Sequence, residues 1–170
     1  DALRAKLLEV TGETQNMPSN AECEQGWGLR AQYKEGNTGK VRAVLEALTL
    51  GERSSKQELL ALPEGLSVEQ VMPQKWETNW PLVTVDAEII ANRKRLLHSI
   101  GNLTLVTQNF NSALSNEAFS VKRSEIVTTS LLTLNAYFQK FGDKDVWDEQ
   151  QITMRAKELF PLALKIWARP

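Results

Sequence analysis

The sequence contains very little cysteine and histidine. Its 170 residues include one cysteine, Cys23, and one histidine, His98. A single cysteine excludes an internal disulfide and a zinc ribbon built on paired cysteines. We therefore expect a protein of a reducing compartment, the cytoplasm.

Long apolar runs and a strong charge of one sign are also missing. No run is long enough to span a bilayer, and no signal peptide precedes the chain, so we expect no membrane contact. Twenty Lys and Arg residues oppose 21 Asp and Glu residues, which gives a net charge of −1. A global basic field of the kind found in many DNA-binding domains is absent, so any DNA contact needs a local patch.

What remains is the composition of a soluble globular protein, 42% hydrophobic and 24% charged. The length suits one domain spanning residues 1–170. We divide it into a helical lead-in (1–65), a central core with a helical insertion (66–123) and C-terminal helices (124–170). Because the chain begins at Asp1 and not at Met, we interpret it as the C-terminal fragment of a longer protein.

The hydrophobic pattern predicts a mainly α fold with one small β-hairpin. Alternating apolar and β-branched residues predict strands over residues 67–71 and 103–107. Residues 11–39 are polar and rich in glycine, which favours irregular structure. Helices are expected over 40–50, over 86–99 with Asp86 as its cap, over 125–141, and over 146–167, where Pro161 predicts a kink or a break.

Three polar residues stand at the ends of the predicted hairpin. Glu69 lies on the first strand, Asn102 precedes the second strand, and Asn111 lies on the helix that follows it. Mg²⁺ and Mn²⁺ prefer oxygen ligands, and Mg²⁺ keeps several waters. One carboxylate and one amide, Glu69 and Asn111, are therefore adequate protein ligands for such an ion.

This order of residues resembles the HNH nuclease motif. In particular, the chain resembles the C-terminal HNH-type domain of GmrSD-like Type IV restriction enzymes and of phosphorothioate-dependent phage-defence nucleases. The similarity is carried by residues 68–74, 98–105 and 111–116, with Phe119, Lys122 and Arg123.

The resemblance implies a ββα-metal core embedded in a helical domain. It implies a metal-dependent DNA endonuclease, nicking or cleaving, of a bacterial anti-phage defence protein, with Mg²⁺ or Mn²⁺ held by Glu69 and Asn111. Asn102 would brace the loop and orient the catalytic base. The substrate would be phage or modified DNA, delivered by an upstream NTPase or sensor domain of the ParB-like kind.

Position 70 departs from this pattern. The family has Glu-His on the first strand, whereas this chain has Glu69-Gln70. An amide cannot accept a proton near neutral pH, and a general base typically contributes about 10²–10⁴-fold in rate. We therefore predict impaired cleavage. Two alternatives stay open: a catalytically inactive DNA-binding or regulatory module, and a helical interaction domain whose asparagines are only caps and turn residues.

His98 has two interpretations. Its place four residues before Asn102 matches a histidine that is common in the resembling family. The imidazole is either a structural group at a helix end or a substitute base or phosphate contact.

Two groups of residues are candidates for DNA contact. The resemblance implies that Asn116, Lys122 and Arg123 lie beside the active site and contact phosphate. Alternatively, Asn116 caps the next helix and the two cations are solvated. Arg93, Lys94 and Arg95 form the densest basic cluster, which is either a DNA patch or a solvated helix face.

Overall fold

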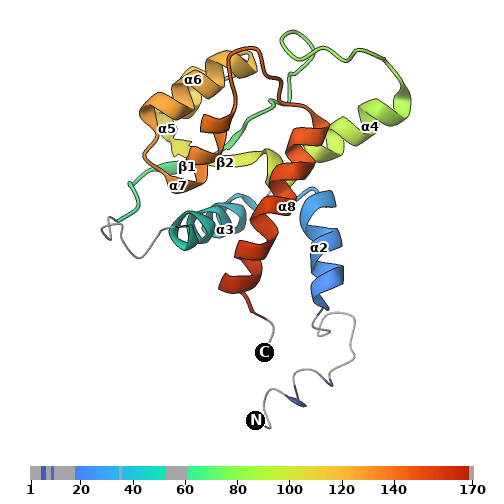
Figure 1. Cartoon of the computed structure of the whole chain (residues 1–170), viewed down its shortest axis with the longest axis vertical. Helices are drawn as coiled ribbons and strands as arrows, with labels where there is room; N and C mark the ends of the chain where they lie inside the picture. Colours follow the sequence, from blue (N-terminus) through green and yellow to red (C-terminus); the bar gives the residue numbers. More distant parts are fainter. Residues whose placement is uncertain (1–4, 7–8, 10–17, 35, 53–60, 169–170) are drawn as a thin grey trace.

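A computed structural model describes residues 5–6, 9, 18–34, 36–52 and 61–168 (Figure 1). Of the expected helical lead-in, the described part includes helices α2 (Asn20–Leu29) and α3 (Thr38–Gly51). Most of residues 1–17 and residues 53–60 lie outside the described ranges. The prediction of irregular structure over residues 11–39 is wrong over residues 20–29, where α2 forms, and at residues 38–39, where α3 begins. A capping box starts it: the Glu22 amide donates to Ser19 Oγ, and the Glu22 carboxylate accepts from the Ser19 amide.

Within the described residues the fold is mainly helical, with one two-stranded antiparallel sheet. Strand β1 (Leu66–Gln70) pairs with β2 (Leu103–Thr107), and Glu69 lies opposite Thr104. The predicted second strand is confirmed, and the first begins one residue earlier than predicted. Helix α5 (Gln108–Leu114) follows β2 directly and packs against both strands.

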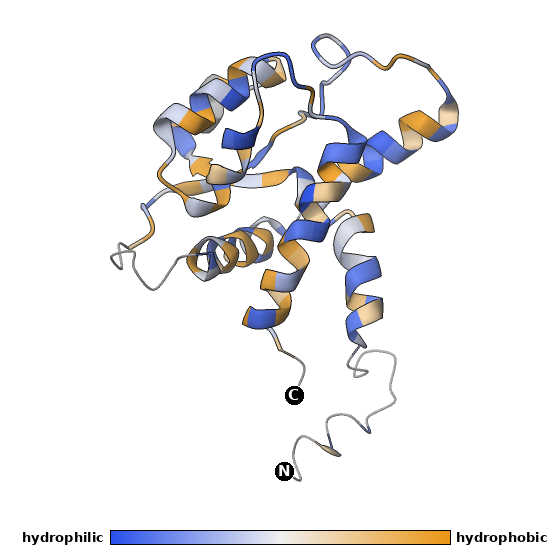
Figure 2. Cartoon of the chain, viewed as in Figure 1, coloured by the Kyte–Doolittle hydropathy of each residue, from blue (hydrophilic) through white to orange (hydrophobic). Residues whose placement is uncertain are grey.

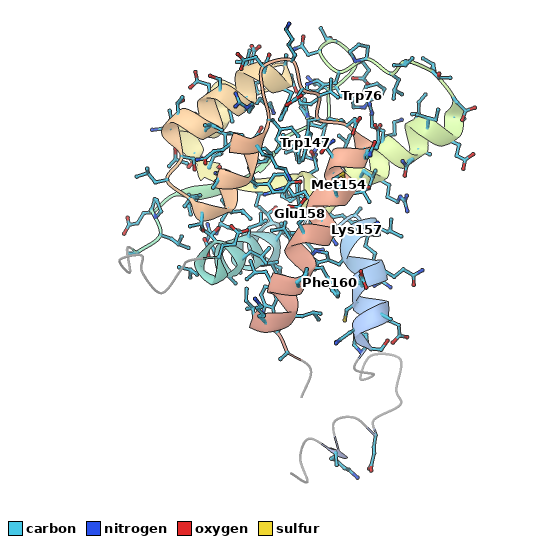
Figure 3. The ribbon with its side chains drawn as sticks, viewed as in Figure 1. Trp76, Trp147, Met154, Lys157, Glu158 and Phe160 are labelled. Carbon is cyan, nitrogen blue, oxygen red and sulfur yellow. The ribbon has the colours of Figure 1, made fainter. Side chains whose placement is uncertain are left out.

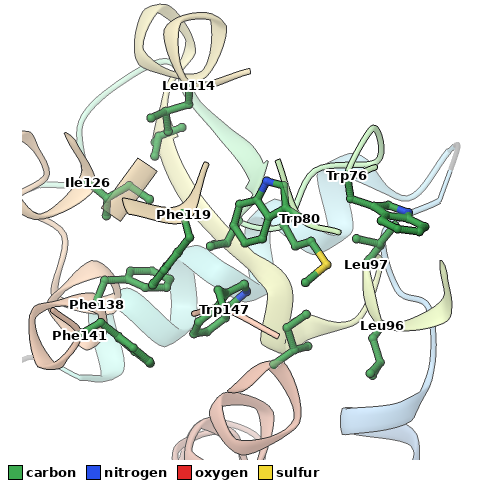
Figure 4. Packing of buried hydrophobic residues seen from close by; sticks show 14 residues of the cluster. Trp76, Trp80, Leu96, Leu97, Leu114, Phe119, Ile126, Phe138, Phe141 and Trp147 are labelled. Atoms are coloured by element: carbon green, nitrogen blue, oxygen red, sulfur yellow. The ribbon is translucent and has the colours of Figure 1, made fainter. Parts of the chain in front are cut away.

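The hairpin separates two hydrophobic cores, because alternate side chains of a strand point to opposite faces. Leu103 and Leu105 pack with α3 and with α8 (Glu149–Ile166), whereas Val106 packs with α5 and α6 (Phe119–Thr129). Hydrophobic residues accordingly alternate with hydrophilic ones along α3 and α8 (Figure 2). In the second core the rings of Phe119 and Trp147 stack with their centroids 5.7 Å apart, beside Phe138 and Phe141 (Figure 4).

Helix α8 contacts the hairpin through its entry turn, the 3₁₀ helix η1 (Ile100–Asn102). A Cβ atom at Gly101 would lie 2.0 Å from the Ile152 carbonyl oxygen, so the two backbones touch. Helix α2 packs on α8 as well: Trp27 Nε1 donates to the Ala156 carbonyl at 2.9 Å, and the Trp27 ring lies against Phe160, which is labelled in Figure 3. The turn that carries Asn102 is therefore fixed by the C-terminal helix.

The insertion between the strands contains helix α4 (Ala87–Leu96). Asp86 caps it as predicted, accepting a hydrogen bond from the Glu88 amide at 2.7 Å. The helix ends at Leu96, three residues earlier than expected. No helix in the described ranges is both long enough and apolar enough to cross a membrane.

The C-terminal part corrects two predictions. Residues 125–141 do not form one helix: α6 ends at Thr129, and α7 (Thr133–Ala136) and the 3₁₀ helix η2 (Tyr137–Lys140) follow. The buried Asn135 amide donates to Ser130 Oγ at 2.7 Å and to the Leu105 carbonyl at 2.8 Å, which ties the interruption to the hairpin. The expectation of a break at Pro161 is wrong, because α8 continues through this residue.

Candidate active site at the hairpin

The end of β1 opens into a small cavity. Glu69 and Gln70 line it together with Asn116, and its volume is about 330 Å³. Glu69 is 6% exposed and sits at the boundary between this cavity and the core. Two of the predicted site positions and one predicted DNA contact therefore meet in one place.

Asn102 braces the chain immediately after Gln70. It is fully buried, and its Oδ1 accepts from the Met72 amide at 2.8 Å and from Trp147 Nε1 at 3.0 Å. Its Nδ2 donates to the Met72 carbonyl at 2.8 Å and to the Leu97 carbonyl at 2.9 Å. Its own carbonyl accepts from the Val71 amide. The side-chain amide of Asn102 therefore has all its hydrogen-bonding positions occupied. Its role is to fix the segment around Gln70 and not to bind a ligand.

The Gln70 side chain is held by its neighbours. Nε2 donates to the Leu97 carbonyl at 2.7 Å, and Oε1 accepts from Gln74 Nε2 at 3.1 Å. Glutamine thus stands at the position of the expected base with a defined orientation. An amide in this position can orient a water molecule by hydrogen bonding, but it cannot remove a proton from it.

His98 lies beside Gln70. Its Nδ1 is 3.4 Å from Gln70 Nε2, and its carbonyl accepts hydrogen bonds from the amides of Gln32 and Tyr33. A donor facing Nδ1 favours the tautomer with the proton on Nε2. In that tautomer Nδ1 is the basic nitrogen, and it faces an amide. The geometry favours a supporting imidazole over a substitute base.

Glu69 forms a buried ion pair with Lys122 of α6. Lys122 Nζ lies 2.5 Å from Glu69 Oε1 and 3.0 Å from the Gln70 carbonyl oxygen. Burial raises the pKa of the Glu69 carboxyl, and the nearby Lys122 charge opposes that shift. Burial likewise lowers the pKa of the Lys122 ammonium, against the opposing effect of Glu69. Lys122 contacts Oε1 of the carboxylate and does not line the cavity, whereas Glu69 does.

Asn111 lies on α5, which packs against both strands. Its side chain is outside the described part of the structure, so its convergence with Glu69 stays a prediction. No group of three or more His, Cys, Asp or Glu residues that could hold a metal occurs among the described residues. The donors near the cavity are one carboxylate and several amides. This oxygen-only set fits a weakly held, mostly hydrated Mg²⁺ or Mn²⁺ ion and does not fit zinc.

The predicted DNA contacts divide into exposed and buried groups. Lys122 has no exposed surface, which contradicts both its assignment to phosphate and the alternative of a solvated cation. Arg93 is also buried: it pairs with Glu149 and donates to the Trp80 carbonyl at 2.5 Å. Buried, engaged cations of this kind are unsuited to phosphate, so Arg93 fits neither interpretation of residues 93–95, the DNA patch or the solvated helix face.

The other candidates remain accessible. Lys94 and Arg95 are exposed on α4, and Arg95 donates to Asn92 Oδ1 at 2.6 Å. Arg123 is partly exposed and pairs with Asp143 at 3.2 Å. Asn116 is half-buried at the cavity and does not cap α6, whose N-cap position is Ala118. Their contact with DNA stays a prediction.

A larger hollow of about 610 Å³ lies between residues 79–84 and 143–149. Its carboxylates have structural partners: Asp143 binds Arg123, Asp145 accepts from the Gly142 amide, Asp148 caps α8, and Glu149 binds Arg93. The hairpin cavity is the better candidate site despite its smaller size, because it brings Glu69 and Gln70 together with Asn116.

Sequence reasoning gave no role at the site to Tyr33, Gln74 and Lys75, which also line the cavity. Gln74 lies within the resembling stretch 68–74 and Lys75 follows it directly, so their proximity could have been inferred from spacing. Tyr33 comes from the polar stretch between α2 and α3, and its sequence carries no signal of a site.

Comparisons with known proteins give one family match. The family described as "GmrSD restriction endonucleases, C-terminal domain" matches residues 17–162. The chain is also similar to Dicer-like protein 2 of Coccidioides immitis (strain RS), with 34% identity over 76 residues, which cover 42% of this chain and 5% of that protein. So short a share of that protein carries no argument about function. No solved structure matches.

Proposed function

The chain belongs to the family of GmrSD restriction endonuclease C-terminal domains, and we propose that it is a metal-dependent DNA endonuclease domain of the HNH type, from a bacterial anti-phage defence protein. The family implies DNA as the substrate class. The observation that supports the finer assignment is that the fold brings Asn116 to the cavity lined by Glu69 and Gln70, beside the turn braced by Asn102. The order β1, β2, α5, with α4 and η1 between the two strands, supports the proposal of a ββα-metal core.

In this proposal Glu69 and Asn111 hold Mg²⁺ or Mn²⁺. The ion would polarise the scissile phosphate and stabilise the leaving oxygen. Glu69 would supply a carboxylate oxygen from the wall of the cavity, and Asn102 would keep position 70 facing it. Gln70 orients a water molecule without deprotonating it, so cleavage by the chain is slow.

A catalytically inactive DNA-binding or regulatory module is the second candidate. The hydrogen bonds of Gln70 to Leu97 and Gln74 favour it, because they fix a group without basicity at the base position. Such a module would bind DNA in a salt-sensitive manner and would cleave it under no substitution at position 70. In either case, an upstream sensor domain of the ParB-like kind would select the DNA to be bound.

The test is the substitution Gln70→His, with nicking and linearisation of a supercoiled plasmid followed in Mg²⁺ and in Mn²⁺. We expect cleavage to rise by up to about 10²–10⁴-fold, the usual contribution of a general base. Loss of cleavage on removal of the ion with EDTA would show that it requires the metal.

Two control variants make the result specific. Gln70→Leu removes the hydrogen bonds without supplying a base, and it should not raise the rate. Glu69→Gln placed in the Gln70→His background should abolish the gain. If Gln70→His binds DNA but cleaves no faster than the parent chain, the endonuclease proposal fails and the regulatory module is selected.

A further inference from the structure

The wall of the hairpin cavity includes a residue from the N-terminal part of the chain. Tyr33 lies between α2 and α3, more than 30 residues before the motif, yet it lines the cavity with Glu69 and Gln70. Its ring is half-buried and packs against the core formed by α3 and α8. One part of the ring is thereby supported by the core while another part borders the cavity.

The loop that carries Tyr33 is fixed to the entry of β2. The amides of Gln32 and Tyr33 donate to the His98 carbonyl at 2.8 and 3.0 Å. The Gln32 side chain accepts from the Ile100 amide at 2.9 Å and donates to the Trp27 carbonyl at 2.8 Å. These bonds set the position of Tyr33 relative to the turn that contains Asn102. The ring is therefore held in place before any ligand arrives.

The cavity wall combines three kinds of chemistry. Tyr33 supplies an aromatic surface, Lys75 supplies an exposed ammonium, and Gln74 and Asn116 supply amides. The negative charge of Glu69 is offset by Lys122 behind it, so it does not repel an anion strongly. Aromatic stacking beside a backbone-binding cation is the means by which proteins hold unpaired nucleotides, because only an unstacked base offers its face.

We propose that Tyr33 and Lys75 form a nucleotide-binding wall of this cavity: Tyr33 stacks on the base of one unpaired nucleotide, and Lys75 contacts an adjoining phosphate. This inference rests on the proposed function and specifies its substrate as single-stranded or locally unpaired DNA. Gln74 and Asn116 are placed to hydrogen-bond the edge of the same base.

The experiment measures binding separately from cleavage. The 170-residue chain is titrated in EDTA into a fluorescein-labelled single strand, and into the same sequence as a duplex, with anisotropy as the readout. We expect tighter binding to the single strand. Tyr33→Leu should weaken single-strand binding by about 5- to 150-fold, the range expected for one stacked base. Tyr33→Phe keeps the ring and should retain the parent affinity.

Lys75→Gln tests the phosphate contact. It should reduce the slope of log affinity against log salt by about 0.7 on a single strand. Lys157→Gln, an exposed cation on α8 outside this cavity, should leave the slope unchanged. Thermal unfolding of each variant shows that the fold is intact.

Two outcomes would overturn the inference: equal affinity of Tyr33→Leu and the parent for the single strand, or binding of the duplex at least as tightly as the single strand. Either result would leave the proposed endonuclease untouched if Gln70→His cleaves plasmid. Conversely, Tyr33-dependent binding without cleavage by Gln70→His would support the nucleotide wall and reject catalysis.

Discussion

Lys122 and Glu69, separated by 53 residues in the sequence, form an ion pair whose side chains are 0% and 7% exposed. The pair joins α6 to the end of β1, next to the position where a catalytic base is expected. Replacing either residue alone by an uncharged one would leave the other charge buried without its partner.

Breaking this pair from one side should therefore destabilise the protein strongly. We expect Lys122→Met to lower the free energy of unfolding by about 3–5 kcal/mol, measured by urea denaturation. Adding Glu69→Gln should restore much of that loss, because no unpaired charge then remains in the core. The exposed pair Arg42–Glu46 on α3 is the control, and Arg42→Met should cost less than about 1 kcal/mol. Equal losses of unfolding free energy in Lys122→Met and Arg42→Met would contradict a structural role for Lys122.

His98 should prove to be a supporting residue. In the Gln70→His background, we expect His98→Ala to lower the plasmid cleavage rate by less than about tenfold, well below the usual effect of removing a general base. The reason is that His98 does not line the cavity, and in the parent chain its Nδ1 faces the side chain of Gln70, 3.4 Å away. A loss of 10³-fold or more, with the fold intact by circular dichroism, would assign the imidazole to catalysis.

Two glycines offer a matched test of the contact between η1 and α8. Gly101→Ala should lower the free energy of unfolding by at least about 3 kcal/mol, because its Cβ would meet the Ile152 carbonyl at 2.0 Å and backbone cannot move aside cheaply. Gly39→Ala in α3 meets nothing within 4 Å and should stabilise by about 0.4–1 kcal/mol. Changes in unfolding free energy of opposite sign for the two variants, measured by chemical denaturation, would confirm the close approach of η1 and α8. A Gly101→Ala variant as stable as the parent would refute it.

The pair between Arg93 and Glu149 should make stability depend on acid pH. Burial alone would raise the pKa of Glu149, but the hydrogen bonds and charge of Arg93 outweigh it and hold the pKa below the ordinary 4.5. The stabilisation is therefore fully present well above pH 4.5 and is lost as the pH falls through the lower folded-state value. We expect the difference in unfolding free energy between the parent and Glu149→Gln to shrink below pH 4.5. A difference that stays constant down to pH 2 would contradict this account.

The sequence was most informative where a local pattern decides the structure. The alternation around Leu105 identified β2, and the carboxylate of Asp86 identified the start of α4. Helix α2 was missed although Ser19 and Glu22 form a recognisable capping signal, because the glycines that follow outweighed it. The break between α6 and α7, after Thr129, contains no proline or glycine. It is held by the hydrogen bond of Asn135 to the Leu105 carbonyl, which lies far away in the sequence.

The positions of the candidate site follow from spacing and resemblance, but the partners of its residues do not. Glu69 and Gln70 line one cavity and Asn102 braces the turn after them, while their roles in metal binding and catalysis stay predictions. The burial of Lys122 could not be foreseen, because lysine is usually exposed and only the folded chain brings Glu69 to it. Tyr33 was missed for the same reason: its place at the cavity depends on hydrogen bonds to His98, 65 positions further along by their residue numbers.

The packing around Ala156 indicates where a shortened chain that still folds should begin. An added Cβ at Gly28 would lie 3.7 Å from the Ala156 methyl group, and one at Gly101 would lie 3.2 Å from it. Early, middle and late segments of the chain thus pack on one small side chain. A shortened protein that starts after α2 would expose the face of α8 that carries Ala156. It would also lose the hydrogen bond from Trp27 Nε1 to the Ala156 carbonyl. Any linker to a preceding domain should therefore be cut upstream of Ser19, where the α2 cap is still complete.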